Sequence, residues 1–359
     1  MKKTAIPTLF FALILLLSAC GSQNETPAAQ DYVQLADLDI TQCVSAVTYK
    51  GLSTEKGDAA LTDAEFETGL NNFLTVQASD VQVTDRAVKD GDTVSLSYEA
   101  TDGNKVITDF WQDNAELTIG SGSTFPEFEN VLVGKSCGED FTVNVTLPES
   151  VSKDYGGKAV TVMVQIDYIV EKDVPKLTDD FVKTLDVCDC KTVDEFKTAY
   201  RAYLQKSKEA YMESTYKSDL WDKVMATAEL TNTGVSYVDS FCRQKQDECI
   251  SAAENAGAPL DDFTVSKGYD DGAALLAAVK ESAEKQARTT VVMYYIAKAE
   301  GLSYTDDEYY DAVDIYAYYL GYDSTADMIN ALGVESIKQT VGDSLIYDKV
   351  QTLVADIAA

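Results

Sequence analysis

Hydrophobic and polar positions alternate along residues 90–168, in four runs separated by polar segments. A period of two is typical of a strand with one buried face, because successive side chains of a strand point to opposite sides. Asp102-Gly103 lies between the first two runs and has the composition of a tight turn. The pattern therefore predicts an antiparallel sheet whose inward residues are Val94, Leu96, Tyr98, Leu117, Ile119, Phe141, Val143, Val145, Leu147, Val160, Val162, Val164, Ile166 and Tyr168.

A single helical segment, residues 124–133, interrupts this alternation. Thr124 and Glu127 have the spacing of a capping box, Pro126 falls in the first turn, and Gly134 is a typical helix end. We expect the sheet to curve over this one short helix and to leave a concave apolar pocket between them.

The rest of the chain has mainly the helical period. One or two strands are expected in residues 31–50, and a capping box at Thr62 and Glu65 predicts a helix over 61–76. From Thr192 the period stays helical, with a break at residues 232–234 and a loop over 257–272. The predicted helices cover residues 192–229, 236–253, 273–300, 305–320, 325–332 and 334–357.

Helices this long, joined by short turns, favour hairpin arms over one compact ball. The first of them has an apolar stripe made of Phe196, Tyr200, Tyr203, Tyr211, Trp221 and Met225. In the tyrosine-rich helix near 304–322, Tyr310, Tyr318 and Tyr322 are expected to face outward. The predicted fold class is α+β: an antiparallel curved sheet over one short helix, followed by an all-α domain of long helical arms.

Specific stretches of the chain resemble a known family. LTIGSGSTFPEFENVLVGK (117–135), FTVNVTLPE (141–149), GKA (157–159) and VPKLTDDF (174–181) resemble the FKBP-type peptidyl-prolyl isomerase domain of the trigger factor family and its exit segment. The resemblance covers residues 62–359 and is specific between 90 and 185. It implies an N-terminal strand and helix segment over 31–86, an isomerase-like domain over 87–173 and a helical chaperone domain over 174–359. The Gly-Phe-Arg-x-Gly-Lys ribosome-contact signature of the family is missing, so no ribosome partner is expected.

The resemblance also implies an isomerase site. Tyr98 matches an aromatic residue of the first strand, and Phe125 matches the position whose backbone N–H meets the substrate carbonyl. Phe128 matches the aromatic pocket floor, and Tyr155 lies in the loop over the pocket mouth. These four are the predicted catalytic residues, and Val106, Ile107 and Val162 are predicted to contact substrate at positions where the family often has other residues.

Prolyl isomerisation needs no nucleophile and no cofactor. Its barrier, about 18–20 kcal/mol, is the partial double bond of the amide, and an apolar pocket lowers it by favouring the twisted amide. That suits a chain with no histidine. The packing alternative is that Tyr98, Phe128 and Val162 are ordinary core residues of a sheet and helix domain.

The N-terminus has the features of a targeting segment. Lys2 and Lys3 precede an apolar run over 6–17, and LSACG (17–21) resembles a bacterial lipobox. The resemblance implies a signal peptide over 1–19, a lipid on Cys20, a tether over 20–30 and a protein anchored outside the cytoplasm on the cell membrane. The alternative is an ordinary secretory signal whose cysteine is incidental.

The charge balance excludes one class of partner. The chain has 29 basic and 60 acidic side chains, a net charge of −31. Removal of residues 1–19 takes away Lys2 and Lys3 and no acid, which leaves 27 basic side chains and a net charge of −33. A surface this acidic repels nucleic acid.

Six cysteines remain besides Cys20: Cys43, Cys137, Cys188, Cys190, Cys242 and Cys249. An even number in an exported protein favours disulfides, with inert thiols or half a metal site at Cys188-x-Cys190 as alternatives. Cys242 and Cys249 lie about 10 Å apart along one predicted helix, too far to bridge each other.

Three functions fit these observations. The first is an anchored prolyl isomerase and chaperone for unfolded, proline-containing exported polypeptides. The second is a non-catalytic holdase with a degenerate isomerase pocket. The third, a surface adhesin or solute-binding lipoprotein, is disfavoured because the chain lacks the strand and helix alternation of two α/β lobes.

Overall fold

The computed structural model describes residues 32–103, 105–265 and 268–358. The predicted signal peptide, Cys20 and the tether lie outside these residues. The chain forms two compact units, one of Leu61–Gln205 and one of the residues up to Ala60 together with those from Lys206 onward. Helix α5 (Val193–Thr227) contributes to both units. Within the described part of the chain, no helix combines the length and apolar character needed to cross a bilayer.

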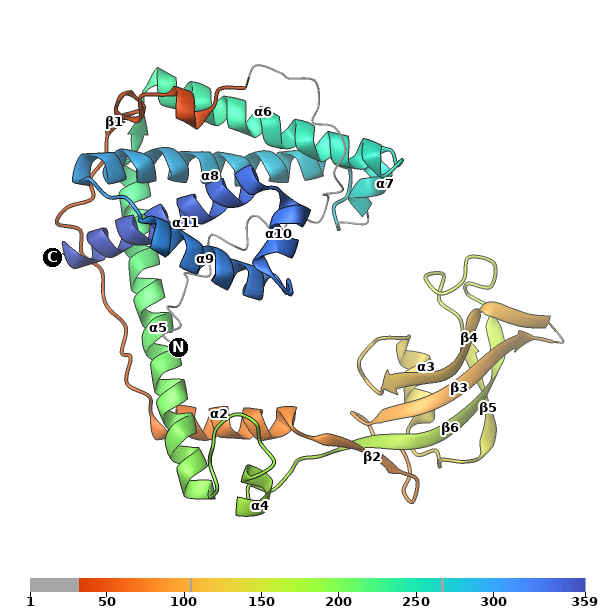
Figure 1. The fold of residues 1–359 in the computed structure, drawn as a ribbon. Helices are drawn as coiled ribbons and strands as arrows, with labels where there is room; N and C mark the ends of the chain where they lie inside the picture. Colours follow the sequence, from red (N-terminus) through yellow and green to blue (C-terminus); the bar gives the residue numbers. More distant parts are fainter. Residues whose placement is uncertain (1–31, 104, 266–267, 359) are drawn as a thin grey trace. The chain divides into compact units, whose positions relative to one another are not determined.

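The first unit contains the predicted antiparallel sheet. Its strands are β2 (Ser79–Val83), β3 (Thr93–Asp102), β4 (Lys105–Thr118), β5 (Asp140–Thr146) and β6 (Ala159–Asp173) (Figure 1). The long strand β6 is central, because it pairs with β3 along one edge and with β5 and β2 along the other. Gly103 has a φ of 62° in the turn between β3 and β4, which confirms the turn expected there.

Strand β4 is longer and less regular than its sequence suggests. The alternation predicted only a short second run at Leu117 and Ile119, but the strand begins at Lys105. Its register with β3 shifts twice, and Asn114 adopts a left-handed backbone with a φ of 51°. The N–H of Asn114 donates to Ser97 Oγ at 3.1 Å, which holds this bulge against β3.

The short helix α3 spans Pro126–Leu132. The predicted capping box between Thr124 and Glu127 is wrong, because Phe125 is the N-cap and its side chain caps nothing. Glu127 Oε2 instead accepts the N–H of Thr146 at 3.1 Å. The true partner of Thr124 is Glu129, whose Oε1 accepts both its N–H and its hydroxyl.

Helices α2 (Asp63–Val76) and α4 (Asp179–Val182) complete this unit with the first turns of α5. The predicted capping box at Thr62 and Glu65 is confirmed. Phe66, Leu70 and Phe196 are buried in a cluster of their own, separate from the core of the sheet. The unit therefore has two hydrophobic clusters, one under the sheet and one between the helices.

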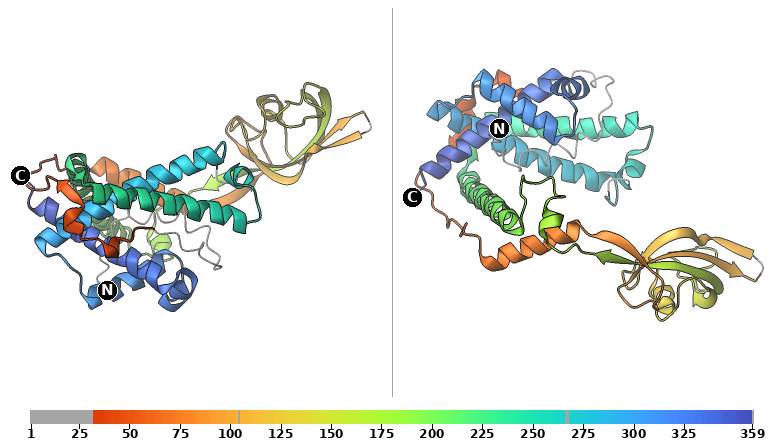
Figure 2. Two further views of the ribbon diagram at one scale, coloured as in Figure 1. Left: turned by 90° about the horizontal axis from the view of Figure 1, so that it is seen from above. Right: turned by 60° about the horizontal axis from the view of Figure 1, so that its bottom comes forward.

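The second unit is mainly helical. Its elements are two 3-10 turns (Leu35–Asp37 and Ile40–Gln42), β1 (Val44–Ala46), β7 (Glu229–Leu230), α6 (Asn232–Asn255), α7 (Leu260–Val265), α8 (Gly272–Glu300), α9 (Asp306–Tyr319), α10 (Thr325–Leu332) and α11 (Val334–Asp356). Helices α6 and α8 run side by side (Figures 1 and 2). Strand β1 pairs with β7, so only one of the strands expected in residues 31–50 forms a ladder.

Two predictions about these helices are wrong. Residues 232–234 were expected to separate two helices, but they form the first turn of α6, which is capped by Thr231. The interruption between α5 and α6 lies at β7 instead. Helix α7 lies inside the segment predicted to be a loop. The end of α8 at Gly301, with a φ of 67°, and the capping box at Thr305 and Glu308 are confirmed.

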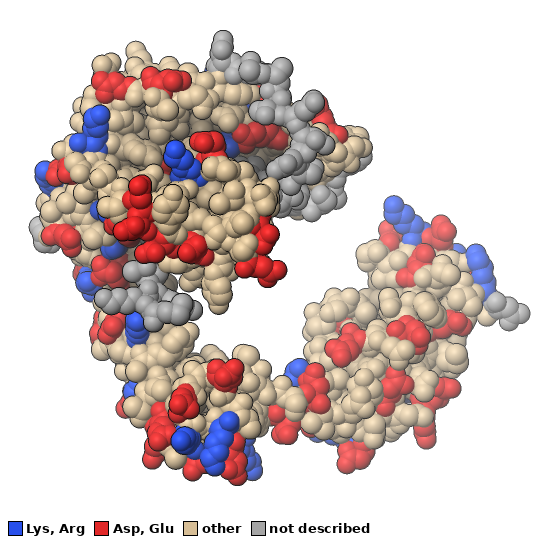
Figure 3. Space-filling view, in the orientation of Figure 1, with Lys and Arg blue, Asp and Glu red and all other residues tan. Residues whose placement is uncertain are grey.

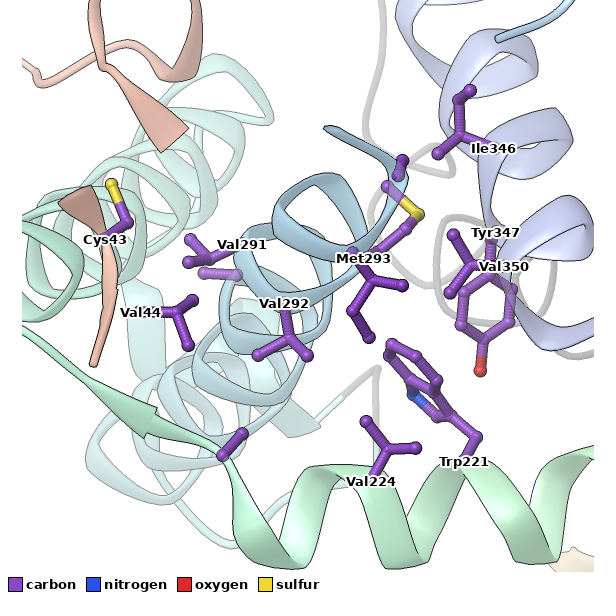
Figure 4. Packing of buried hydrophobic residues seen from close by; sticks show 14 of the residues in the cluster. Cys43, Val44, Trp221, Val224, Val291, Val292, Met293, Ile346, Tyr347 and Val350 are labelled. Carbon is purple, nitrogen blue, oxygen red and sulfur yellow. The ribbon is translucent and has the colours of Figure 1, made fainter. Parts of the chain in front are cut away.

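The core of the second unit gathers around α8 and α11. Trp221 stacks edge-on against Tyr347 with ring centroids 5.3 Å apart, beside Val224 and Val350 (Figure 4). The apolar stripe predicted for α5 is only partly buried. Tyr203 and Tyr211, in the middle of this long helix, are 63% and 66% exposed.

One disulfide is present among the described residues: Cys188 is bonded to Cys190. Cys242 and Cys249 are not bonded to each other, as expected from their spacing on α6. Both thiols are buried, as is that of Cys43.

Candidate functional site

Four aromatic rings meet between the sheet and α3. Tyr98 comes from β3, Phe110 from β4, Phe125 from the N-cap of α3 and Phe128 from its first turn. The ring centroids of Tyr98 and Phe110 are 4.6 Å apart, and Phe128 lies 5.0 Å from both. Phe125 lies 5.3 Å from Phe110 and 5.9 Å from Phe128. We call these four residues the aromatic cluster.

The aromatic cluster is almost fully shielded from solvent. The exposed fraction is 9% for Tyr98 and 0% for Phe128, with Phe110 and Phe125 in between. Burial raises the pKa of the Tyr98 hydroxyl, so this group stays neutral at physiological pH. The cluster thus supplies an apolar surface without ionised groups, which fits chemistry that needs no acid or base.

Three of the four rings are predicted site residues, and the fourth is not. Phe110 was missed because the register shifts of β4 break the alternation that would have marked it as inward. Its aromatic character, three residues after Ile107, is the only signal that the sequence offered. The structure brings Phe110 into contact with each of the other rings.

Glu129 organises the loop that leads into α3, and the sequence did not mark it as functional. Its side chain is 2% exposed and accepts the N–H groups of Gly120 at 2.8 Å, Gly122 at 3.2 Å and Thr124 at 3.0 Å. Burial alone would raise the pKa of Glu129, but the hydrogen bonds from Thr124 and Gly122 outweigh it and lower that pKa. The carboxylate therefore fixes the backbone immediately before Phe125.

This arrangement leaves one donor beside the rings. No described residue accepts the N–H of Phe125, whereas Glu129 takes the N–H of the preceding Thr124. The first N–H groups of a helix have no partner inside the helix, so one of them can meet an outside acceptor. The site therefore combines an aromatic surface with one backbone donor.

The loop after β5 is anchored to β4. Ser152 is buried, and its hydroxyl donates to Asp109 Oδ2 at 2.6 Å while accepting the N–H of Tyr155 at 3.3 Å. The Tyr155 ring packs against the core of the sheet, with Lys158 Nζ 4.7 Å and Lys105 Nζ 5.3 Å from its centroid. The Tyr155 ring is therefore held by the core of the sheet and by two nearby lysine ammonium groups.

Of the three predicted substrate-contact residues, two are buried in the core and one is exposed. Ile107 and Val162 are 1% and 0% exposed and lie in the core that contains the aromatic cluster. Val106 is 43% exposed. It pairs with Thr101, while Ile107 pairs with the buried Ala100, so Val106 points away from the aromatic cluster. The structure therefore does not bring Val106 together with the other predicted residues.

Comparison with known proteins agrees with this architecture. The family model "FKBP-type peptidyl-prolyl cis-trans isomerase" matches residues 84–170, which include β3, β4, α3, β5 and most of β6. The model "Bacterial trigger factor protein (TF) C-terminus" matches residues 192–356, the long helices. The predicted fold class is confirmed, and so is the expected resemblance to an FKBP-type domain followed by a helical domain.

Individual relatives match over most of the chain. The trigger factor of Geobacillus kaustophilus is 31% identical over 341 residues, covering 89% of this chain and 79% of that protein. The trigger factor of Limosilactobacillus fermentum is 30% identical, covering 83% and 68%, and that of Staphylococcus saprophyticus is 30% identical, covering 82% and 65%. A solved trigger factor chaperone superposes on 88% of this chain and 73% of its own with 16% identity and a TM-score of 0.45, too weak a likeness for comparing side chains.

The match to the Geobacillus kaustophilus protein exceeds 30% identity and spans more than two thirds of both chains. The two family models account for the two kinds of architecture on either side of residue 180. The chain therefore belongs to the trigger factor family and carries an FKBP-type peptidyl-prolyl cis-trans isomerase domain.

Proposed function

We propose that the protein is a lipid-anchored folding factor outside the cytoplasm, which isomerises prolyl bonds and holds unfolded exported polypeptides. One observation carries this proposal: the aromatic cluster lies beside the unpartnered N–H of Phe125. A proline ring needs an apolar, aromatic surface, and the preceding amide needs a donor for its carbonyl. Both are available at the aromatic cluster, which β3, β4 and α3 bring together.

The chemistry follows from the barrier of the X-Pro amide. Twisting the amide removes its resonance, so a pocket that excludes water and grips the ring favours the twisted form over the planar ones. In this proposal Tyr98, Phe110 and Phe128 form the apolar surface and Phe125 donates its N–H to the substrate carbonyl. No residue takes up or releases a proton, which agrees with the neutral Tyr98 hydroxyl.

The activity can be tested with a proline-containing peptide in a protease-coupled isomerisation assay. We expect the wild-type chain to accelerate isomerisation, and the double variant Tyr98→Ala with Phe128→Ala to lose this acceleration. Because truncating two buried rings can unfold the domain, Phe128→Leu serves as the milder variant and thermal unfolding is followed in parallel. Trp111→Ala is the control, since Trp111 is 52% exposed and not part of the aromatic cluster.

A second candidate function is a holdase that binds clients without catalysis. The observation that favours it is the close packing of the four rings, none more than 9% exposed, because a substrate proline would have to displace a ring. The two functions predict different results. Suppression of client aggregation that survives Tyr98→Ala with Phe128→Ala, in a protein without measurable isomerase activity, supports the holdase.

The proposed location rests on the lipobox-like segment at residues 17–21. In that proposal Cys20 carries the lipid and the remaining chain faces exported clients, away from ribosomes and nucleic acids. Labelling of cells with a fatty-acid analogue tests it. We expect the label on the wild-type chain and not on Cys20→Ser, and a wild-type chain without label would contradict the anchor.

A further inference from the structure

Cys188 and Cys190 lie in the loop between α4 and α5, with only Asp189 between them. Their sulfurs are bonded and their Cα atoms are 5.2 Å apart. Both side chains are partly exposed, and the neighbouring Val187 is 61% exposed. The disulfide thus packs against the cluster of Phe66 and Phe196 on one side and remains partly exposed beside Val187 on the other.

The other described cysteines are placed very differently. Cys43, Cys242 and Cys249 are 0%, 4% and 6% exposed. Burial raises the pKa of the Cys43 and Cys242 thiols, so the reactive thiolate form is disfavoured there. Among the described cysteines, Cys137, Cys188 and Cys190 are of intermediate exposure, and only Cys188 and Cys190 are bonded to each other, so they are the one described pair that can pass on a disulfide.

A structural role explains this disulfide poorly. The stabilisation that a cross-link gives through the unfolded chain grows with the length of the loop it closes, and this loop contains one residue between the two cysteines. The neighbouring backbone is already held by other bonds. Glu195 Oε2 accepts the N–H groups of Lys191 and Thr192, and Asp179 Oδ1 accepts that of Val193.

We propose that the Cys188–Cys190 disulfide exchanges with the cysteines of unfolded clients and so transfers disulfide bonds to them. This inference rests on the proposed function in one respect: exported polypeptides are the clients whose cysteines become oxidised. It adds an activity separate from that of the isomerase domain, because Cys188 and Cys190 lie outside residues 84–170.

The proposed exchange takes place in two steps, each of which breaks one disulfide bond and forms another. A client thiolate attacks one sulfur of the pair, breaks the Cys188–Cys190 bond and forms a mixed disulfide, while the other sulfur leaves and takes up a proton. A second client thiolate then attacks the client sulfur of the mixed disulfide, which forms the client disulfide and releases the second cysteine as a thiol. Two electrons pass from the client to the pair, and a low-molecular-weight disulfide such as oxidised glutathione restores the pair and is itself reduced to two thiols.

The attacking client thiols set the pH dependence of this exchange. In the sequence Asp186 and Asp189 flank the two cysteines and Lys191 follows them, while Glu195 accepts the N–H groups of Lys191 and Thr192 and Asp179 accepts that of Val193. Exchange depends on ionisation of the attacking client thiols, so its rate should rise as the pH increases toward the ordinary thiol pKa of about 8.5.

The test uses the full chain in detergent with a reduced, unfolded ribonuclease that needs disulfides for activity, in a buffer of reduced and oxidised glutathione. We expect the wild-type chain to speed the recovery of ribonuclease activity several-fold over the variant Cys188→Ser with Cys190→Ser. Single variants, Cys188→Ser or Cys190→Ser, should accumulate a mixed disulfide with the client that is visible on a non-reducing gel. Cys137→Ser is the matched control and should behave as wild type.

Two results would overturn the proposal. One is equal recovery with the wild-type chain and the double variant, at equal suppression of client aggregation. The other is alkylation of both Cys188 and Cys190 in the native chain after incubation with oxidised glutathione, since the pair would then not re-form. The wild-type chain and the double variant share the aromatic cluster and Cys20, so any isomerase or anchor activity contributes equally to both, and failure of those proposals would leave the difference between them unchanged.

Discussion

Glu129 joins the loop at residues 120–124 to α3 through four hydrogen bonds to one buried carboxylate. Glu129→Gln keeps the length of the side chain but replaces one acceptor oxygen by a donor that faces N–H groups. Hydrogen bonds to a charged group contribute about 1.5–3 kcal/mol each, so we expect a loss of about 2–3 kcal/mol in the free energy of unfolding. Isomerase activity should fall as well, since Phe125 follows this loop directly.

Glu127→Gln is the matched control for that variant, because it lies on the same helix and accepts a single N–H, from Thr146, near the surface. Its cost should stay below about 1 kcal/mol in denaturant unfolding. The lowered pKa of Glu129 adds a pH test: its contribution is present above its ordinary value of 4.5 and is lost as the pH falls through the lower folded value. Equal stability of both variants would contradict the role assigned to Glu129.

The pKa of Asp343 on α11 is raised, whereas that of Glu129 is lowered. It is 8% exposed, and Tyr294 of α8 donates a hydrogen bond to its Oδ1 at 2.6 Å. Burial raises the pKa of Asp343 from 3.8 to about 6, although the bond from Tyr294 lowers it. The folded state therefore binds the proton more tightly than the unfolded state, so stability falls as the pH rises from about 4 through about 6.

Asp343→Asn should remove this dependence, because the amide oxygen can still accept from Tyr294 and carries no charge. A shift of about two pKa units corresponds to about 3 kcal/mol, so we expect the variant to gain about 1–3 kcal/mol at pH 7.5 and little at pH 4. Urea unfolding at both pH values measures the difference. An identical pH profile in wild type and variant would show that another group is responsible.

At the scale of elements, the segment before β1 approaches α6 so closely that one position must be glycine. A Cβ added to Gly234 would lie 2.3 Å from the carbonyl oxygen of Cys43, a backbone atom that already accepts the N–H of Thr231. Alanine is favoured over glycine inside a helix by about 1 kcal/mol, but here the clash outweighs that gain. We expect Gly234→Ala to cost about 1–3 kcal/mol of stability, measured by chemical denaturation.

Gly69→Ala in α2 provides the comparison. Its added Cβ would lie 2.7 Å from the Cδ1 of Leu204, and its other near neighbours are Cδ2 and Cγ of the same side chain, which can move aside. The helix propensity gain should then offset most of the strain, and Gly69→Ala should be close to neutral. A Gly234→Ala variant as stable as Gly69→Ala would mean that the segment at Cys43 does not pack against α6 as described.

The sequence predicts elements well where periodicity and caps agree. The helices that begin at Thr62 and Thr305 and the end of α8 at Gly301 are marked by local chemistry, and the structure has them there. Only the end of strand β4, at Leu117, was predicted, because the bulge at Asn114 shifts the side chains between faces, and Phe110 therefore escaped the pattern. Glu129 was missed because its partners are backbone groups of a glycine-containing loop, which no side-chain pattern reveals.

At the scale of the whole molecule, the charge balance acts on every part of the chain. Carboxylates outnumber basic groups over the face seen in Figure 3, in keeping with a net charge of −31. Self-repulsion of this kind destabilises a compact state and is screened by salt, whose screening length falls from about 8 Å at 0.15 M to about 3 Å at 1 M. We expect sodium chloride to raise the Tm steadily over this range, and a Tm that falls with salt would mean that ion pairs such as Arg86–Asp92 outweigh the repulsion.

The two compact units have separate hydrophobic cores, so they are expected to unfold separately even though α5 belongs to both. Glu129 is buried in the unit of Leu61–Gln205, and Asp343 is buried in the other. Scanning calorimetry at pH 7.5 should therefore record two transitions, with Glu129→Gln lowering the temperature of one and Asp343→Asn raising that of the other. Because α5 is continuous, the alternative is that its helix couples the units into one cooperative transition. In that case both variants would move the same single peak, and the free energies measured for the two residues could no longer be assigned to separate units.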